Sequence, residues 1–286
     1  MIQDIGASRY HNEYRHISPE EESKILCYKD GKILVKNREN EISFLSFQEV
    51  KKEYPGMKGE YRYAFSIDGT GYFLQPALAK EKFGNIGEEH GEAEPVWAGI
   101  DFLRKAGPCE EAFAGVTGFQ LWGWYQSRRF CPACGQKMRH SEEERMMYCP
   151  VCGQREYPKI NPAVIVAVTE GDKLLLTKYA GRAYTRYALI AGYTEIGETV
   201  EETVQREVME EVGLKVKNIR YYKSQPWSFT DTLLMGFFAE VDGDDTIRLD
   251  ENELQVAKWC PREEIPQNDG ISLTREMMEV FKTGRA

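Results

Sequence analysis

Three glutamates in the second half of the chain are spaced so that a helix would place them along one edge. Glu210 and Glu211 follow Glu207 by three and four positions, the separations at which side chains on a helix become neighbours. Carboxylates crowded in this way repel one another unless a cation neutralises them. Mg²⁺ and Mn²⁺ prefer such oxygen ligands and usually bind them together with substrate phosphates. The spacing suggests a metal site, although composition alone would favour a solvated, charged helix.

The neighbouring residues predict where this helix begins and ends. Thr199 followed by Glu202 has the form of a capping box. Gly213 is suited to end the helix in a left-handed conformation. We therefore expect a helix over residues 200–212.

Four cysteines form a second group with chemical potential. Two CxxC motifs separated by fourteen residues supply Cys131, Cys134, Cys149 and Cys152, close to the spacing of four-thiolate zinc sites. Four thiolates complete a tetrahedron with no open position, so the site would be structural and hold one Zn²⁺ per chain. Metal binding would stabilise a segment with too few apolar residues to fold by burial alone. Two disulfides, a redox CxxC and an iron site are the alternatives.

Charged residues of both signs surround these cysteines. Arginines and lysine stand at 128, 129, 137, 139, 145 and 155, and glutamates stand at 142, 143, 144 and 156. Such a mixed surface neither requires nor excludes contact with RNA.

The composition describes a folded chain with an acidic surplus. Of its 286 residues 42% are hydrophobic, enough for a sizeable core. The 46 acidic and 37 basic residues give a net charge of −9, so a large basic face for nucleic acid is not expected. The N-terminus has no apolar core of signal-peptide type, and the longest clean apolar run is residues 163–168. The seven cysteines are an odd number, which leaves any all-disulfide scheme incomplete and favours a reducing compartment. We therefore expect a soluble, cytoplasmic protein with no membrane contact.

The chain divides by composition into three expected parts. Residues 1–128 form an α+β domain, residues 129–158 a zinc ribbon, and residues 159–286 a mixed α/β domain.

Within the first part, turn residues interrupt two strand-like runs. Residues 25–35 and 61–74 are each broken by Asp-Gly and are predicted to be hairpins. Apolar residues at helical spacing predict helices near residues 96–103 and 113–124.

In the last part, strands are expected on both sides of the acidic helix, and a second helix near the C-terminus. The expected strands are residues 163–169, 173–178, 187–191, 214–223 and 232–241, and the final helix is residues 272–281.

The spacing around the acidic helix matches the Nudix box in full. That pattern is Gly, five residues, Glu, seven residues, Arg-Glu, an aliphatic residue, any residue, Glu-Glu, any residue, Gly and an aliphatic residue. It is filled here by Gly192, Glu198, Arg206, Glu207, Glu210, Glu211 and Gly213. The last part of the chain therefore resembles the Nudix hydrolases, which cleave nucleoside diphosphates linked to another moiety. The resemblance implies an α/β/α sandwich with a mixed sheet.

The resemblance also implies roles for individual residues. The ligands of a catalytic Mg²⁺ or Mn²⁺ would be Glu207, Glu210, Glu211, Glu253 and the Ala191 carbonyl. Arg206 and Glu198 would brace the loop and the helix, and Gly192 and Gly213 would be structural. One of the glutamates would deprotonate the attacking water.

A second motif follows the box. Residues 224–232, Ser-Gln-Pro-Trp-Ser-Phe-Thr-Asp-Thr, resemble the SQPWPFPxS signature of NADH pyrophosphatases, but Ser228, Thr230 and Thr232 replace proline, proline and serine. Trp227 and Phe229 could be ordinary core residues, yet beside the box their faces could stack a base or nicotinamide ring. The substrate residues that the resemblance implies are Gln225, Pro226, Trp227, Ser228, Phe229, Thr230, Asp231 and Thr232, together with Glu144, Tyr157, Tyr193 and Thr274.

Both motifs imply a NADH pyrophosphatase of Nudix type. Such an enzyme splits NAD(H) into NMN(H) and AMP, and the family also removes NAD caps from RNA 5′ ends. Its members are homodimers, so we expect a homodimer here. One alternative is a Nudix hydrolase that prefers ADP-ribose or another dinucleotide, because the altered proline positions could reshape the pocket. Another is a non-catalytic nucleotide sensor or RNA-binding module.

Overall fold

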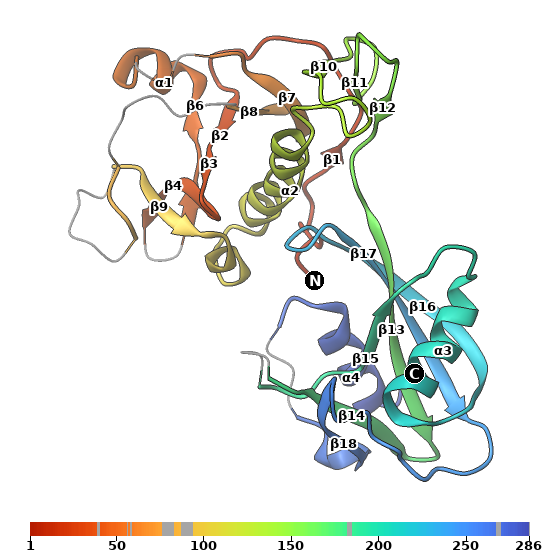
Figure 1. Cartoon of the computed structure of the whole chain (residues 1–286). Coiled ribbons are helices and arrows are strands. Elements are labelled where there is room, and N and C mark those ends of the chain that lie inside the picture. The colour runs from red at the N-terminus through yellow and green to blue at the C-terminus, as the bar shows by residue number, and fades with distance from the viewer. Residues whose placement is uncertain are drawn as a thin grey trace. The chain divides into compact units, whose positions relative to one another are not determined.

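The computed structural model describes residues 1–38, 41–55, 57, 59–75, 83–86, 94–181, 185–266 and 270–285 (Figure 1). They form two compact units. The C-terminal unit contains Met1, Ile160–Trp227 and Asp231–Ala286, and the N-terminal unit contains Ile2–Lys159 and Ser228–Thr230. In the part of the chain that is described, no helix is both long and apolar enough to cross a membrane.

A mixed six-stranded sheet is the centre of the C-terminal unit. Its central strand β13 pairs with β14 and β15 in antiparallel fashion and with β17 in parallel. The order is β16-β17-β13-β14-β18, with β15 also on β13. The strands are β13 (Asn161–Glu170), β14 (Lys173–Tyr179), β15 (Ile190–Tyr193), β16 (Val216–Trp227), β17 (Thr232–Val241) and β18 (Leu254–Pro261).

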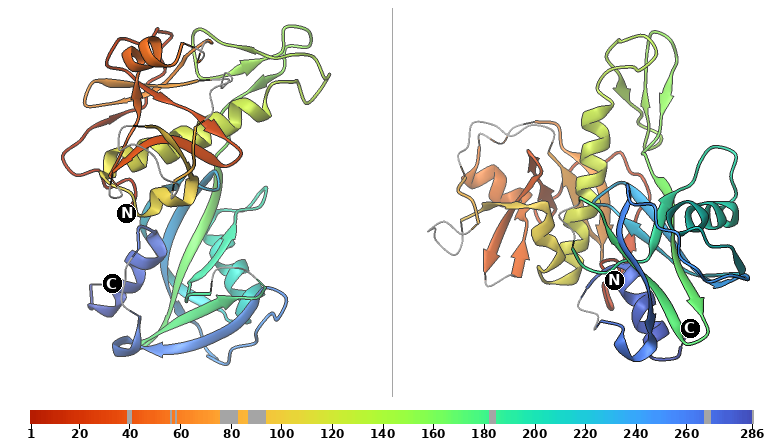
Figure 2. Two further views of the ribbon diagram at one scale, coloured as in Figure 1. Left: turned by 90° about the vertical axis from the view of Figure 1, so that its left-hand side faces the viewer. Right: turned by 60° about the horizontal axis from the view of Figure 1, so that its bottom comes forward.

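Alternation along β13 gives this sheet two apolar faces. Val164, Val166 and Val168 pack in one core with helix α3 (Val200–Val212). Side chains of the intervening residues, such as Ile165, pack in a second core with helix α4 (Leu273–Lys282). Successive strand residues point to opposite faces, so α3 and α4 cover opposite sides of the sheet (Figure 2). The expected α/β/α sandwich with a mixed sheet is confirmed.

Helix α3 has the predicted ends. The Thr199 hydroxyl accepts a hydrogen bond from Glu202 N, and the Glu202 carboxylate accepts one from Thr199 N, which completes the capping box. Gly213 ends the helix with φ +68°, in the left-handed region that glycine tolerates best.

Three strands of this sheet differ from the sequence expectation. The strand expected at residues 187–191 lies instead at Ile190–Tyr193, as β15. Strand β16 ends at Trp227, four residues beyond the expected end at Lys223. Strand β18 was absent from the expectation. It lies at the sheet edge and pairs with β14, and its buried residues, Leu254 and Cys260, stand too far apart to give a period-two pattern.

Both predicted hairpins occur in the N-terminal unit. Strands β3 (Tyr28–Lys29) and β4 (Lys32–Arg38) are joined by Asp30-Gly31, and both turn residues have positive φ. Strands β7 (Arg62–Ile67) and β8 (Thr70–Leu74) are joined in the same way by Asp68-Gly69. Paired positive φ values match the twist of the flanking strands.

These hairpins belong to two small sheets. A five-stranded sheet has the order β1-β7-β8-β2-β6, and a four-stranded sheet has β3-β4-β5 with β9 on β4. The remaining elements are β1 (Tyr10–His11), β2 (Lys24–Leu26), β5 (Glu41–Ser43), β6 (Leu45–Ser46), helix α1 (Phe47–Glu53) and β9 (Val96–Gly99).

Of the two helices expected in this unit, the structure contains one. Helix α2 (Cys109–Ser127) covers the expected residues 113–124. The helix expected at 96–103 is wrong, because the chain forms β9 followed by a 3₁₀ turn, Ile100–Arg104. Val96 and Ala98 are both buried in the pairing with β4, so tertiary pairing overrides the apolar spacing.

Small residues let α2 lie close to the sheets. A Cβ added to Gly118 would lie 2.4 Å from the Tyr28 hydroxyl, and that hydroxyl donates a hydrogen bond to Gly115 O at 2.6 Å. A larger residue at Gly118 would push the helix away.

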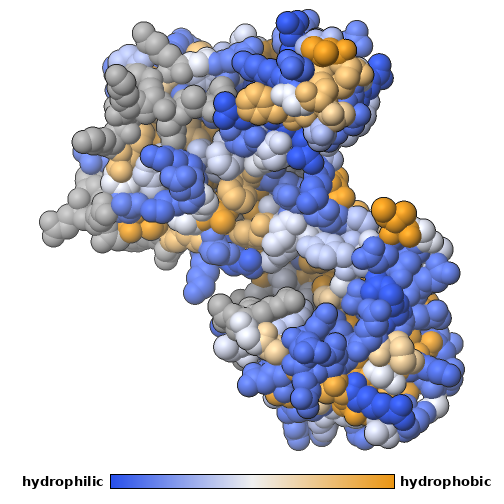
Figure 3. All heavy atoms as spheres, viewed as in Figure 1, coloured by the Kyte–Doolittle hydropathy of each residue, from blue (hydrophilic) through white to orange (hydrophobic). Residues whose placement is uncertain are grey.

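The cysteine-rich segment forms a three-stranded sheet that is tied to the rest of the N-terminal unit. Its strands are β10 (Arg139–His140), β11 (Met147–Tyr148) and β12 (Arg155–Glu156). Tyr14 donates a hydrogen bond to Ser141 O (2.8 Å), and Arg145 donates to Asn12 Oδ1 (2.6 Å) and to Ala64 O. In the view of Figure 1, its surface mixes hydrophilic and hydrophobic residues (Figure 3).

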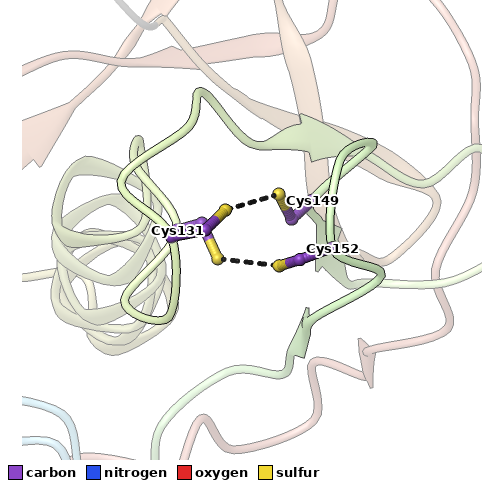
Figure 4. A group of neighbouring side chains, drawn as sticks. Cys131, Cys149 and Cys152 are labelled. Carbon is purple, nitrogen blue, oxygen red and sulfur yellow. Dashed lines mark hydrogen bonds between the residues drawn. The ribbon is translucent and has the colours of Figure 1, made fainter.

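The four cysteine sulfurs converge on one point (Figure 4). All lie within 4.8 Å of one another, with Cys131 Sγ and Cys134 Sγ each 3.5 Å from a sulfur of the other pair. Sulfurs bound to one tetrahedral zinc at about 2.3 Å would be about 3.8 Å apart, whereas a disulfide needs about 2.05 Å. The quartet therefore fits a structural Zn²⁺ and not two disulfides.

We predict that zinc holds this segment folded. Elemental analysis should find one zinc per chain, and a strong chelator should lower the melting temperature, because metal binding here supplies folding free energy. Cys152→Ser should lose the zinc and several kcal/mol of stability, whereas Cys109→Ser, an exposed cysteine outside the cluster, should lose neither. A metal-free wild type with unchanged stability would contradict the prediction.

A second prediction concerns Glu111, in the first turn of α2. Burial raises the pKa of its carboxyl from 4.5 to about 7, and Tyr72 donates to it at 3.3 Å. A raised folded pKa stabilises the fold fully below pH 4.5, and this contribution is lost as the pH rises through 7. Glu111→Gln should therefore raise the free energy of unfolding by roughly 1–3 kcal/mol near pH 8 and change it little near pH 4.

Urea unfolding at both pH values measures this difference. Glu110→Gln removes the same charge from the same turn and serves as the control. Equal stabilisation by the two variants would rule out burial of Glu111 as the cause.

Candidate active site

Helix α3 turns two of its three clustered glutamates toward the sheet. Glu207 is 9% exposed and Glu211 is 3% exposed, whereas Glu210 lies on the open side of the helix. Burial raises the pKa of the Glu207 carboxyl, and the nearby Glu210 and Glu253 raise it further. Carboxylates are rarely buried without a compensating cation, so this arrangement suits a positively charged ligand.

Arg206 connects the helix to the preceding loop and strand. Its Nη1 donates to Glu207 Oε1 (2.7 Å) and Glu210 Oε2 (2.9 Å). Its Nε and Nη2 donate to the two Glu198 oxygens at 2.5 and 3.0 Å, and Nη2 also donates to Tyr193 O at 2.9 Å. One guanidinium thus braces three segments, as the box resemblance implies.

Glu198 is in turn held by the loop. Its Oε2 accepts hydrogen bonds from Glu195 N (3.1 Å) and the Thr203 hydroxyl (3.0 Å). The hydrogen bonds from Arg206, followed by that from Glu195 N, lower the pKa of Glu198 to about 2. Glu198 is therefore a permanent anion that orients Arg206.

Gly192 makes room for Glu207. It lies in β15, opposite Val164 of β13. A Cβ at this position would lie 1.9 Å from Glu207 Cδ, so any other residue would displace the carboxylate. The first glycine of the box is needed for the close approach of a side chain, not for a special backbone angle.

Glu253 approaches the cluster through a loop that runs past the end of α3. Arg248 N donates to Val212 O at 2.8 Å, and Asp250 N donates to Glu211 O at 3.0 Å. These bonds bring Glu253, exposed just before β18, near enough to raise the pKa of Glu207.

The donor chemistry of this site fits Mg²⁺ or Mn²⁺. The carboxylate oxygens of Glu207, Glu210, Glu211 and Glu253 and the carbonyl oxygen of Ala191 in β15 are hard donors of the kind that these ions prefer. Among the described residues, only the cysteine quartet has ligand atoms all within 4.8 Å of one another. In the acidic cluster, Arg206 pairs directly with Glu207 and Glu210.

The motif of residues 224–232 forms the tip of the β16–β17 hairpin. Trp227 and Thr232 are the last paired residues, and residues 228–231 form the turn, with Asp231 at φ +56°. Asp231 O accepts a hydrogen bond from Asn161 N at 2.7 Å. Pro226 and Thr230 are exposed, and Trp227 is half-buried.

Gln225, expected among the substrate residues, lies completely inside the C-terminal unit. Its side chain is 0% exposed, donates to Ile271 O at 2.9 Å and accepts from Leu273 N at 2.7 Å. It therefore fixes the start of α4. The next residue, Thr274, is half-buried in the first turn of that helix, so Gln225 acts by positioning α4.

The turn residues Ser228–Thr230 cluster with the N-terminal unit. There the Phe229 ring lies 4.2 Å from the Arg104 guanidinium carbon, in a cation–π contact. Arg104 is itself paired with Asp101 at 2.8 Å. Sequence reasoning missed Arg104, because nothing in its local sequence indicates a contact so far along the chain. Ser228 is 5% exposed.

The remaining expected substrate residues form two pairs. In the C-terminal unit, the Tyr193 hydroxyl lies 3.4 Å from the Thr232 hydroxyl. In the N-terminal unit, the Tyr157 hydroxyl donates to Glu144 Oε1 at 3.2 Å. Both tyrosine rings are more than half exposed, so their faces are accessible to a planar ligand.

Two known families match neighbouring parts of this chain, within residues 126–281. The NUDIX domain matches residues 159–281, and the NADH pyrophosphatase zinc ribbon domain matches residues 126–157. The NAD-capped RNA hydrolase NudC of Salmonella schwarzengrund is 40% identical over 198 residues, 66% of this chain and 76% of the relative. The protein of the same name from Pectobacterium atrosepticum is 43% identical over 150 residues, 52% of this chain and 57% of the relative.

Solved structures include a Nudix hydrolase from Nitrosomonas europaea. It matches 55% of this chain and 92% of its own, with 24% identity and a TM-score of 0.48. The identity to the Salmonella relative, over three quarters of that relative's length, together with both domain matches, assigns the family. This chain belongs to the Nudix hydrolases, in the group that carries the NADH pyrophosphatase zinc ribbon.

Proposed function

We propose that this protein hydrolyses the pyrophosphate bond of NAD(H), giving NMN(H) and AMP, and that it removes NAD caps from RNA 5′ ends. The observation that carries the proposal is the pair of buried glutamates on α3, Glu207 and Glu211, in a complete Nudix box beside a ribbon of the NADH pyrophosphatase type. The capped RNA contains the same bond, because it is the dinucleotide extended from its adenosine ribose.

In this proposal the glutamates and the Ala191 carbonyl hold Mg²⁺ or Mn²⁺. Such an ion, once bound, would screen the pyrophosphate charge, polarise phosphorus and acidify a water. One of Glu207, Glu210, Glu211 and Glu253 accepts the proton of that water. Arg206 and Glu198 keep the helix and loop in register.

The substrate residues divide by chemistry. Tyr157, Tyr193 and Trp227 offer aromatic faces that can stack a base or nicotinamide ring. Glu144, Thr232 and Thr274 offer polar atoms, and Pro226, Ser228, Phe229, Thr230 and Asp231 shape the hairpin tip. Gln225 contributes by holding α4.

A homodimer in the cytoplasm completes the proposal. The homodimer is based on the family resemblance, and light scattering coupled to size exclusion will measure it. A reducing compartment agrees with seven cysteines that form no disulfide.

One observation favours a second candidate, a Nudix hydrolase that prefers ADP-ribose. Ser228 and Thr230 replace the prolines of the signature, which removes two fixed φ angles from the hairpin tip. A non-catalytic sensor is disfavoured, because every glutamate of the box is present.

A substrate panel tests the activity. With Mg²⁺ and with Mn²⁺, we expect kcat/KM for NADH or NAD⁺ to exceed that for ADP-ribose by about tenfold or more, the discrimination that one good pocket contact provides. NAD-capped RNA should be cleaved at the same bond, with release of NMN. A clear preference for ADP-ribose over NADH would refute the proposed substrate.

The metal-ligand assignment predicts the effect of Glu211→Gln. The substitution removes one charge without changing shape, so kcat should fall by about a hundredfold or more. Stability should change much less than activity, because the carboxamide keeps the size and shape of the carboxylate.

Glu201→Gln is the matched control. Glu201 lies on the same helix but is exposed and outside the cluster, so its variant should retain wild-type activity. Equal activity of Glu211→Gln and wild type would remove Glu211 from the metal site.

A further inference from the structure

Two adjoining cavities lie in the N-terminal unit, where α2, β7 and the zinc ribbon meet. The larger, about 390 Å³, is lined by residues that include Trp122, Arg129, Lys137 and His140. The smaller, about 180 Å³, extends toward Arg15 and His16. Glu60, Arg62 and Tyr125 line both cavities, so the two adjoin at these residues. Together they are here called the basic furrow.

The furrow concentrates positive charge in an acidic protein. Among its described lining residues, Glu60 is the sole carboxylate, and it pairs with Arg62 at 2.5 Å. Arg129 and Lys137 are exposed, and no carboxylate of the described residues lies within 4 Å of either. Their charges are therefore available to an anionic ligand.

In the folded ribbon, some of the basic residues are paired or turned inward, and others line the furrow. Arg128 is paired with Glu156 at 3.0 Å, and Arg145 is turned inward to Asn12 and Ala64 O. Neither lines the furrow. The ribbon glutamates 142–144 do not line it either.

Aromatic rings lie among these charges. Trp122 is half-buried and is held by Tyr28 and Phe119, with ring centroids 5.6 and 6.0 Å away. The ring of Tyr125 lies 4.9 Å from that of His140. Burial, with Arg62 beside it, lowers the pKa of His140 to about 4, so at neutral pH its ring is uncharged and can both donate and accept a hydrogen bond.

A groove lined by unpaired cations, with the partly exposed rings of Trp122 and His140 beside them, suits single-stranded nucleic acid. Backbone phosphates neutralise the cations, and bases contact the exposed parts of these two rings, whereas Tyr125 is only 9% exposed and forms part of the wall. We propose that the basic furrow binds the single-stranded RNA that follows the NAD cap. This inference rests on the proposed removal of NAD caps, and it assigns the RNA chain to a site separate from the Nudix box.

The test compares two double variants of the intact protein. Arg129→Gln with Lys137→Gln removes two furrow cations. Arg139→Gln with Arg155→Gln removes two exposed cations from the same ribbon that line neither cavity. Zinc content and melting temperature show that each variant is folded.

Binding is measured first, in a Glu211→Gln background, in which cleavage of the RNA is expected to be at least about a hundredfold slower. The probe is an unstructured RNA of about twenty nucleotides, with an NAD cap or with a 5′-monophosphate. The furrow variant should bind both RNAs about tenfold or more weakly, and the slope of log Kd against log salt should fall by about 1.4, the loss of two phosphate contacts on a single strand. The ribbon control should match the parent.

Turnover is measured next, with Glu211 restored. The furrow variant should hydrolyse NADH at the wild-type kcat/KM but lose about tenfold in kcat/KM on capped RNA. Three results would overturn the proposal that the furrow binds RNA: equal effects of both double variants, no effect of either, or an equal loss of kcat/KM on NADH. Failure of wild type to hydrolyse NADH would refute the proposed function instead, and RNA binding would still test the furrow.

Discussion

The close approach of Glu207 to Gly192 is the constraint on which the candidate active site depends. A carboxylate lies where even a methyl group on β15 would collide with it, so helix and strand must meet at one fixed depth. The valines of α3 that pack under β13 set this depth. Arg206, bonded at once to α3, the loop and β15, then fixes the rotation of the helix. Packing and charge thus specify the same geometry by independent means.

The acidic surplus of the sequence also has a structural place. Seven glutamates and one arginine lie in residues 195–211. Most of these glutamates have a definite structural role. Glu202 caps the helix, Glu198 orients Arg206, and Glu207 and Glu211 are buried toward the sheet. In the N-terminal unit, by contrast, Arg129 and Lys137 line the larger cavity, and none of the ribbon glutamates 142–144 lines it. Net charge alone therefore says little about which anions a protein accepts.

Local signals made α3, the cysteine quartet and both hairpins predictable. Thr199, Glu202 and Gly213 act within one helix, and each CxxC turn orients its own two sulfurs. Features that depend on distant partners were not predictable. The β9 segment resembled a helix until its pairing with β4 was known, and β18 presents few buried residues because it lies at an edge. The role of Gln225 became visible only with α4 in place. The box itself could be recognised from spacing, but the reason for its first glycine could not.

The assignment of the β16–β17 hairpin tip to the N-terminal unit affects where the chain can be divided into fragments. Ser228–Thr230 cluster with one unit, while the residues on either side belong to the other, so the boundary between units does not fall at a single point in the chain. A fragment that begins at residue 160 would contain the whole Nudix box and its sheet. It would nevertheless carry Phe229 without Arg104, its cation–π partner. A cut at residue 160 therefore does not follow the division of the structure into its two units.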